Sequence, residues 1–138
     1  IVLNGNEING DLNVDMFEMA EMVMTLAAAA VFAKSPIEIH GVSHIRNHES
    51  DRISAICEEL KKVGVKCEEY YDGLKIYPTT PQYAEVDSHE DHRIAMSLAI
   101  LGLAGNGIVI NNPSCVSKTC PNFFELLKSI GANIKYEY

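Results

Sequence analysis

The chain has 138 residues, 47% of them hydrophobic and 22% charged, a composition typical of one folded domain with an apolar core rather than of a disordered segment. Its formal net charge of −8 argues against nonspecific nucleic-acid binding, which needs a broad basic face. Residues 19–33 form the one long apolar run of the sequence, and this run contains Glu21 and is too short to span a membrane, which takes about 18–20 residues.

The first half of the chain predicts six elements. Alternating apolar residues indicate strands, and runs of helix formers or helical apolar spacing indicate helices. Ser35-Pro36 ends the first helix, Gly64 caps the second, and Asp72-Gly73 marks a hairpin. In chain order we expect a strand at 11–16, a helix at 18–34, a strand at 37–42, a helix at 50–63, and hairpin strands at 65–71 and 74–78.

The second half predicts a proline-bearing loop followed by four elements. The loop covers 78–90, and Pro121 stands near the start of the last helix. The elements are a helix at 92–104, a strand at 107–112, a helix at 121–130 and a strand at 132–138.

These two halves resemble each other in sequence. Met24 matches Met96, Ile39 matches Ile110, and the helix-ending Gly64 matches Gly131. Repeats of this size bury their apolar faces against one another. We therefore expect an α/β (α+β) fold built of repeated βαβαββ units, at about residues 11–77 and 91–138 of one continuous domain fragment, 1–138.

The cysteines make no CxxC pair. Cys57 falls on an apolar helix face and Cys67 in a strand-like run, where small buried thiols are common. The sequence therefore predicts neither a disulfide framework nor a zinc site, and a reducing cytoplasm fits it. Residues 1–3 lack the basic flank of a signal peptide.

Three cations stand beside predicted helix starts. Arg52 ends "NHESDR", Arg93 ends "DHR", and Lys118 precedes the helix at 121–130. Backbone N–H groups and the helix dipole favour anions at such ends, and arginine adds bidentate hydrogen bonds. The pattern predicts an anion-binding cradle. Two plainer interpretations stay open at this point: Arg52 could form a surface pair with Asp51, and Lys118 could be an exposed loop lysine.

Several motifs together resemble the enolpyruvyl transferases, and among them the 5-enolpyruvylshikimate-3-phosphate synthase family. They are "RNHESDRI", "ELKKVGV", "DGLKI", "DHRIAM" and "SKTCP", in that order. The resemblance covers nearly the whole chain and implies a C-terminal fragment of about one third of a two-domain enzyme. It also implies transfer of the enolpyruvyl group from phosphoenolpyruvate to the 5-hydroxyl of shikimate 3-phosphate, with release of phosphate and with no metal or organic cofactor.

The resemblance gives roles to residues of these motifs. Arg52, Arg93 and Lys118 correspond to cations that bind phosphoenolpyruvate, and Lys118 is also expected to be catalytic. Glu49 corresponds to the acidic partner in proton transfer. His92, inside "DHRIAM", is expected to bind substrate.

Three more positions fall on the acceptor side and depart from the usual family pattern. Glu21 aligns with a catalytic aspartate but follows Ala20 instead of a proline. His48 falls where most members carry lysine, and His44 where some carry asparagine. We expect Glu21 to be catalytic and to bind substrate, and His44 and His48 to bind substrate. Which of Glu21 and Glu49 acts as acid and which as base stays open.

Because the family's active site lies between two domains, we expect this chain to supply one wall and to be inactive alone. Its expected partners are phosphoenolpyruvate, shikimate 3-phosphate and the N-terminal domain of the same enzyme, without nucleic acid or membrane. Two alternatives remain: a non-catalytic anion-binding module, and an enolpyruvyl transferase with another acceptor such as UDP-N-acetylglucosamine.

Overall fold

The computed structural model of the chain describes residues 7–137. Residues 1–3, where no signal peptide is expected, and Tyr138, the end of the predicted last strand, lie outside the described residues. No helix within 7–137 has both the length and the apolar character needed to cross a bilayer.

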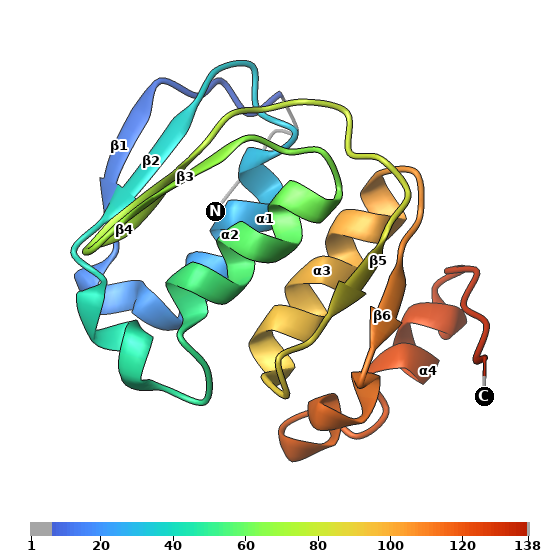
Figure 1. The fold of residues 1–138 in the computed structure, drawn as a ribbon. Coiled ribbons are helices and arrows are strands. Elements are labelled where there is room, and N and C mark those ends of the chain that lie inside the picture. Colours follow the sequence, from blue (N-terminus) through green and yellow to red (C-terminus); the bar gives the residue numbers. More distant parts are fainter. Residues whose placement is uncertain (1–6, 138) are drawn as a thin grey trace, which may run out of the picture.

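The first unit is a four-stranded sheet covered on one face by two helices (Figure 1). Strand β1 pairs parallel with β2, and the hairpin β3–β4 joins β2 through antiparallel β4, so the order is β1-β2-β4-β3. The elements are β1 Leu12–Asp15, the 3₁₀ helix η1 Phe17–Met22, α1 Val23–Ala30, β2 Ile37–His40, the 3₁₀ helix η2 Ser43–Asn47, α2 Arg52–Lys62, β3 Cys67–Tyr70 and β4 Gly73–Ile76.

The second unit repeats the parallel strand–helix–strand pattern on a smaller scale. Strand β5 pairs parallel with β6 in a two-stranded sheet, and α3 connects them. The elements are β5 Glu85–Asp87, α3 His92–Ala104, β6 Val109–Asn111, the 3₁₀ helix η3 Pro113–Lys118 and α4 Phe123–Ser129. The mixed α/β class with repeated units is confirmed, whereas the unit limits 11–77 and 91–138 stay a prediction.

Three predicted elements are wrong in part. The loop predicted at 78–90 contains β5, a three-residue strand too short to produce a periodic signal. The strand predicted at 132–138 is irregular over 132–137, because within the described residues no neighbouring strand follows to complete a hairpin. The helix predicted at 18–34 begins as η1, and α1 ends at Ala30, after which the amides of Lys34 and Ser35 bond to the carbonyl of Asn9.

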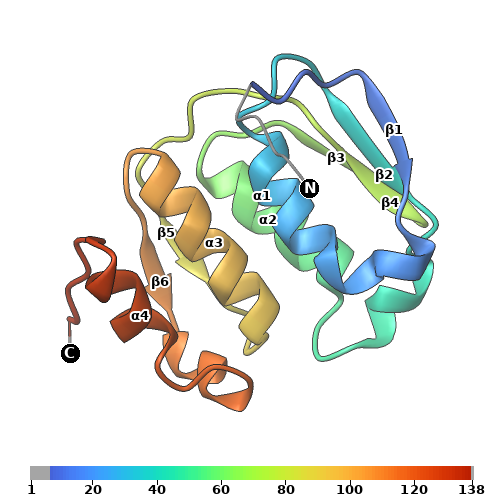
Figure 2. The same ribbon diagram turned by 180° about the vertical axis from the view of Figure 1, so that it is seen from behind.

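Helices α1, α2 and α3 lie side by side with the same direction, which the reverse view also shows (Figures 1 and 2). Equivalent positions of the two units meet between α1 and α3, where the hydroxyl oxygens of Thr25 and Ser97 lie 3.5 Å apart. After α2 and α4, Gly64 and Gly131 both adopt positive φ, at 80° and 103°, and so end the helices as predicted. The matched sequences therefore take matched conformations.

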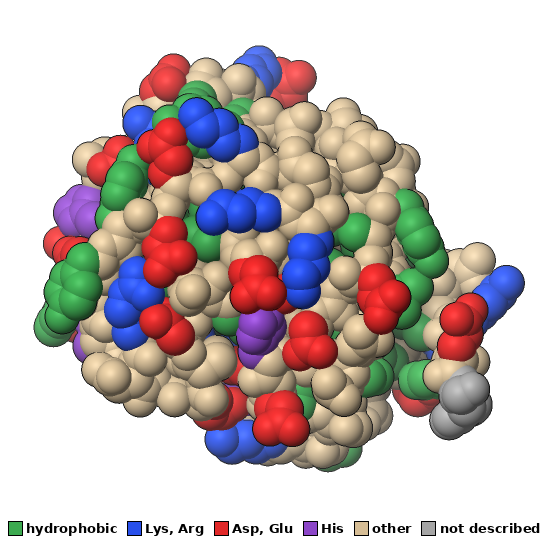
Figure 3. Space-filling view, in the orientation of Figure 1, with side chains coloured by type: hydrophobic (Ala, Val, Ile, Leu, Met, Phe, Trp, Pro, Cys, Tyr) green, Lys and Arg blue, Asp and Glu red, His purple; other side chains and the backbone are tan. Residues whose placement is uncertain are grey.

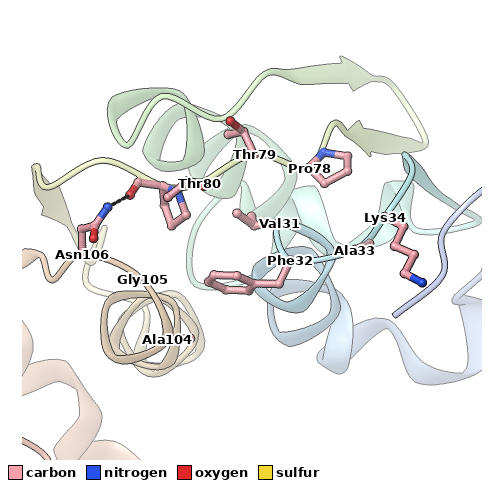
Figure 4. Close-up of a pocket in the computed structure, with 11 residues that line it drawn as sticks. Val31, Phe32, Ala33, Lys34, Pro78, Thr79, Thr80, Ala104, Gly105 and Asn106 are labelled. Atoms are coloured by element: carbon pink, nitrogen blue, oxygen red, sulfur yellow. Dashed lines mark hydrogen bonds between the residues drawn. The ribbon is translucent and has the colours of Figure 1, made fainter. Parts of the chain in front are cut away.

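A cavity of about 500 Å³ lies where α1 and α3 end (Figure 4). Phe32 and Ala104 close one side of it, and Thr79 and Thr80 lie on the connection between the units. The side-chain amide of Asn106 donates to the carbonyl of Pro81 across its rim, at 2.9 Å. Since this cavity sits at the C-terminal ends of the helices, it is separate from the cationic residues at their N-terminal ends.

Two of the thiols are buried together. The sulfur atoms of Cys57 on α2 and Cys67 on β3 lie 2.8 Å apart. The hydrogen bond to Cys67 and burial both raise the pKa of the Cys57 thiol. Cys115 and Cys120 are partly exposed.

We therefore expect thiol reagents to distinguish the two pairs. In the folded chain at pH 8, a disulfide reagent should label Cys115 and Cys120, while Cys57 and Cys67 should react only after unfolding, because a buried protonated thiol is neither accessible nor nucleophilic. Peptide mapping of the labelled protein measures this. Equal labelling of all four thiols without denaturant would show that Cys57 and Cys67 are not buried between α2 and β3.

Candidate active site

The N-terminal ends of the helices meet at one edge of the molecule, the lower edge in Figure 1. Parallel strand–helix–strand units place helix starts at the same edge of their sheets. Asp51 caps α2 by accepting a hydrogen bond from the amide of Ser54 at 3.0 Å, and Asp91 caps α3 through the amide of Arg93 at 2.9 Å. These caps fix the first residues of α2 and α3 and therefore the positions of Arg52 and Arg93.

A buried ion pair joins the starts of α2 and α3. Nε of Arg52 donates to Oδ2 of Asp91 at 2.7 Å, and the hydroxyl of Ser50 donates to the same oxygen at 3.1 Å. The two charged side chains are 3% and 0% exposed, so neither is left to water. Arg52 is therefore not a surface partner of Asp51, which instead accepts two hydrogen bonds from Arg46.

This pair also determines the charge state of the aspartate. Burial by itself would raise the pKa of Asp91, but the hydrogen bonds from Arg52 and from the amide of Arg93 outweigh it, and the pKa lies below its ordinary value. For Arg52, burial lowers the pKa, but the hydrogen bond and charge of Asp91 raise it by more, so the pKa lies above its ordinary value. Both groups are charged at neutral pH.

Glu21 lies between the two arginines. Its Oε2 lies 2.9 Å from Nη1 of Arg52 and 2.5 Å from Nε of Arg93, and Nη1 of Arg93 bonds its backbone carbonyl at 3.4 Å. The Nε–H of Arg93 does not point at the carboxylate, and it is the one buried side-chain nitrogen or oxygen of residues 7–137 that lacks a hydrogen-bond partner. An anion that displaces the Glu21 carboxylate therefore gains Arg93 as a hydrogen-bond donor.

His48 extends this group toward the loop after β2. Its Nδ1 lies 2.9 Å from Nη1 of Arg52 and 3.3 Å from Oε1 of Glu21. His44 stands edge-on to it at 6.1 Å between ring centroids, and Phe17 stands edge-on to His44 at 5.3 Å. A row of rings thus leads from the exposed Phe17 to the arginines.

Glu49, His92 and Lys118 form a second group beside the first. Oε2 of Glu49 lies 2.9 Å from Nδ1 of His92, and its Oε1 accepts from Nζ of Lys118. The hydrogen bond from Lys118, and next that from His92, lower the pKa of the Glu49 carboxyl. Lys118 is therefore not a free loop lysine, although its side chain is 62% exposed.

The structure thus brings the eight predicted residues into two adjoining groups, linked through Asp91, His92 and Arg93 at the start of α3. Sequence reasoning missed Asp91 itself. An aspartate directly before an apolar helix is an N-cap signal, but nothing local indicates that its second oxygen faces an arginine 39 residues away.

Within residues 7–137, two groups of side chains have the spacing of metal ligands: Glu49, Asp91 and His92 here, and Glu58 and Glu59 of α2 with His89 of the loop before α3. In each, a cation of the protein already neutralises the carboxylates. Lys118 and Arg52 do so in the first group, and Lys62 in the second.

The fold is that of the enolpyruvyl transferases. The enolpyruvyl transferase NikO from Streptomyces tendae superposes with a TM-score of 0.79 over 95% of this chain and 30% of its own, a likeness of fold at 18% identity. The EPSP synthase from Acinetobacter baumannii superposes with a TM-score of 0.75 at 33% identity, over 81% of this chain and 27% of its own.

Sequence comparison gives the particular family. The family model for EPSP synthase (3-phosphoshikimate 1-carboxyvinyltransferase) matches residues 2–127, and the chain belongs to this family. A curated 3-phosphoshikimate 1-carboxyvinyltransferase 2 from Halalkalibacterium halodurans is 44% identical over 134 residues, 96% of this chain. One from Nostoc punctiforme is 48% identical over 113 residues, 82% of this chain. The chain spans 26–30% of the length of these two relatives.

We expect Asp91→Asn to destabilise the fold at pH 7 by about 3 kcal/mol, because it leaves a buried guanidinium without its main anion. The pKa of Asp91 is lowered in the folded state, so its contribution is present at neutral pH and is lost as pH falls through that lowered value. Urea unfolding at pH 7 and at pH 3 measures both effects, and the gap between variant and wild type should shrink in acid.

Asp51→Asn is the matched control, because asparagine caps a helix as well as aspartate does and Asp51 is 41% exposed. It should cost less than about 1 kcal/mol. Equal effects of the two substitutions would contradict a special role for the Arg52–Asp91 pair.

Proposed function

We propose that this chain forms one wall of an active site that transfers the enolpyruvyl group of phosphoenolpyruvate to the 5-hydroxyl of shikimate 3-phosphate, with release of phosphate. The observation that carries this is the convergence of Arg52, Arg93 and Lys118 at the helix starts. Phosphoenolpyruvate offers a carboxylate and a phosphate, and these cations match both.

The site balances its own charge before substrate enters. Each of the three cations has a carboxylate partner: Glu21 for Arg93, Asp91 for Arg52, and Glu49 for Lys118. Asp91 is buried and fixed by four hydrogen bonds, whereas Glu21 is half-exposed. An incoming anion therefore competes first with Glu21 for the arginines.

Proton transfer needs a group that gives a proton to the enol carbon and a group that takes one from the attacking hydroxyl. Glu49 is a carboxylate at neutral pH and so is a candidate proton acceptor, although its lowered pKa makes it a weaker base than an ordinary glutamate. Lys118, in contact with it, is suited to donate one. Glu21, beside His48, is the second candidate for the base on the acceptor side.

The rest of the enzyme supplies the other wall. The chain covers only 30% of the length of the Halalkalibacterium halodurans relative, and a site that closes on its substrates needs both sides. We propose that the chain alone has no turnover and that phosphoenolpyruvate, shikimate 3-phosphate and the N-terminal domain are its partners. The two buried free thiols of the α2–β3 packing fit a reducing cytoplasm.

A different acceptor is the second candidate, because the acceptor-side residues Glu21, His44 and His48 depart from the usual pattern of the family. The discriminating assay uses the full-length protein that carries this chain. Phosphate release from phosphoenolpyruvate is measured with shikimate 3-phosphate or with UDP-N-acetylglucosamine. Release with the first compound alone supports the proposal, and release with the second alone overturns it.

Arg93→Ala in the full-length protein should raise the KM for phosphoenolpyruvate by about tenfold to a hundredfold, since a charge-assisted hydrogen bond is worth about 1.5–3 kcal/mol. Lys66→Ala is the control: it removes the same charge from a side chain 66% exposed and far along the sequence from the site motifs. Initial rates of phosphate release give both constants. Unchanged constants for Arg93→Ala would remove this arginine from the site.

Glu21→Gln should have two opposite effects. It should slow turnover, because it removes a candidate base, and it should tighten the binding of inorganic phosphate several-fold, because the two arginines lose their competing carboxylate. Calorimetric titration with phosphate measures the second effect in the absence of catalysis. Glu18→Gln, on the same 3₁₀ helix and exposed, should change neither. Weaker phosphate binding by Glu21→Gln would show that the carboxylate does not occupy the anion position.

A further inference from the structure

A second charged cluster, outside the proposed active site, holds the loop that leads into α3. Glu59 lies on α2 with its side chain fully buried. Its Oε2 accepts from the backbone amide of Asp87 at 2.9 Å, and its Oε1 lies 2.6 Å from Nε2 of His89 and 2.8 Å from Nζ of Lys62. The buried carboxylate of Glu59 thus has three hydrogen-bond partners. Because it cannot exchange them for water, it holds the backbone amide of Asp87 and the side chain of His89 in place.

The held loop has an unusual backbone. His89 and Glu90 are consecutive residues with φ of 52° and 55°, and neither is a glycine. Residues with side chains seldom adopt this left-handed conformation, and two in succession need outside contacts to hold them. The amide of His89 bonds Oδ1 of Asp87 at 2.6 Å, and Ser88 bonds the carbonyl of Asn112 at 2.9 Å.

The strained pair stands directly before the charged start of α3. Asp91, His92 and Arg93 follow it, and the amide of Asp91 bonds the carbonyl of Ser88 at 2.9 Å. Arg52 and Glu59 are seven positions apart on α2 and so share one helix face. Both reach this loop: Arg52 bonds Asp91 at one end and Glu59 bonds His89 and Asp87 at the other.

We infer that Glu59 and His89 are positioning residues of the anion site. Their contact fixes the conformation of the 87–90 loop, and the loop determines the position of the start of α3, which carries Asp91, His92 and Arg93. The inference rests on the proposed function for the identity of the anion. Neither residue touches the cations of the site within the described residues, so their effect passes through the backbone of the loop. Figure 3 shows that the face over α2 on which the cluster lies mixes acidic and basic side chains.

Four substitutions separate positioning from general stability. His89→Phe removes the donor to Glu59 and keeps a ring of similar size, whereas His89→Gln keeps a side-chain donor. Lys62→Ala removes another partner of Glu59, but Lys62 is on α2 itself and does not hold the loop. Glu90→Gly relieves the left-handed backbone without touching the cluster.

The experiment uses the full-length protein that carries this chain, with inorganic phosphate as the probe, followed by calorimetry, and with thermal unfolding measured for every variant. We expect His89→Phe to weaken phosphate binding about tenfold and to raise the KM for phosphoenolpyruvate more than it lowers kcat. His89→Gln should restore affinity to within about twofold of wild type, and Lys62→Ala and Glu90→Gly should stay at wild-type affinity.

Each outcome is informative. If His89→Phe is folded and binds phosphate as wild type does, the inference is overturned while the proposed function stands. If Lys62→Ala weakens binding as much as His89→Phe, the cluster acts through stability of α2 and positioning is again overturned. If the wild-type protein itself neither binds phosphate nor turns over phosphoenolpyruvate, the proposed function fails instead.

Discussion

The buried pair of Arg52 and Asp91 is the constraint on which the rest of the site depends. It crosses from the start of α2 to the start of α3, which belong to different repeat units, and it is more buried than the Glu21–Arg93 and Glu49–Lys118 pairs, which also join the two units. Removing either partner would leave the other charged and out of water, which costs far more than a surface pair does. Two other site residues lie close to it in the sequence: Arg93 is two residues after Asp91, and Glu49, which pairs with Lys118, is three residues before Arg52.

Carboxylates are as numerous in this site as cations, and their exposure divides them by role. Asp91 is fully buried and paired with Arg52, so its role is structural. Glu21 and Glu49 are 47% and 27% exposed and pair with Arg93 and Lys118, the cations nearer to solvent. Such pairs exchange partners at small cost. A site assembled this way can be nearly neutral when empty and still present a strong positive field once a substrate anion has displaced an exposed carboxylate.

Much of the fold was predictable because its signals are local. Gly64, Asp72-Gly73 and the apolar spacing of α2 each determine a backbone conformation within a few residues. The internal repeat then gave the class. The elements that were predicted wrongly depend on distant contacts instead. Strand β5 forms because β6 pairs with it, and residues 132–137 have no such pairing strand within the described chain. Likewise, the motifs predicted that Arg52 and Arg93 face an anion, whereas the contacts of Asp91 and Glu59 are with residues 28 to 41 positions away, which no local pattern indicates.

The balanced site sits in a chain whose formal net charge is −8, and this has a kinetic consequence. Because the cations near the helix starts are already paired, the long-range field of the chain is that of its excess acids, which repels a phosphorylated anion until it is within a few ångströms of the arginines. Dissolved salt screens this repulsion over a Debye length of about 10 Å at 0.1 M and screens the close, partly buried contacts much less. For the field of this chain, moderate salt thus speeds the encounter with a phosphorylated anion, the reverse of the usual behaviour of an electrostatically steered site.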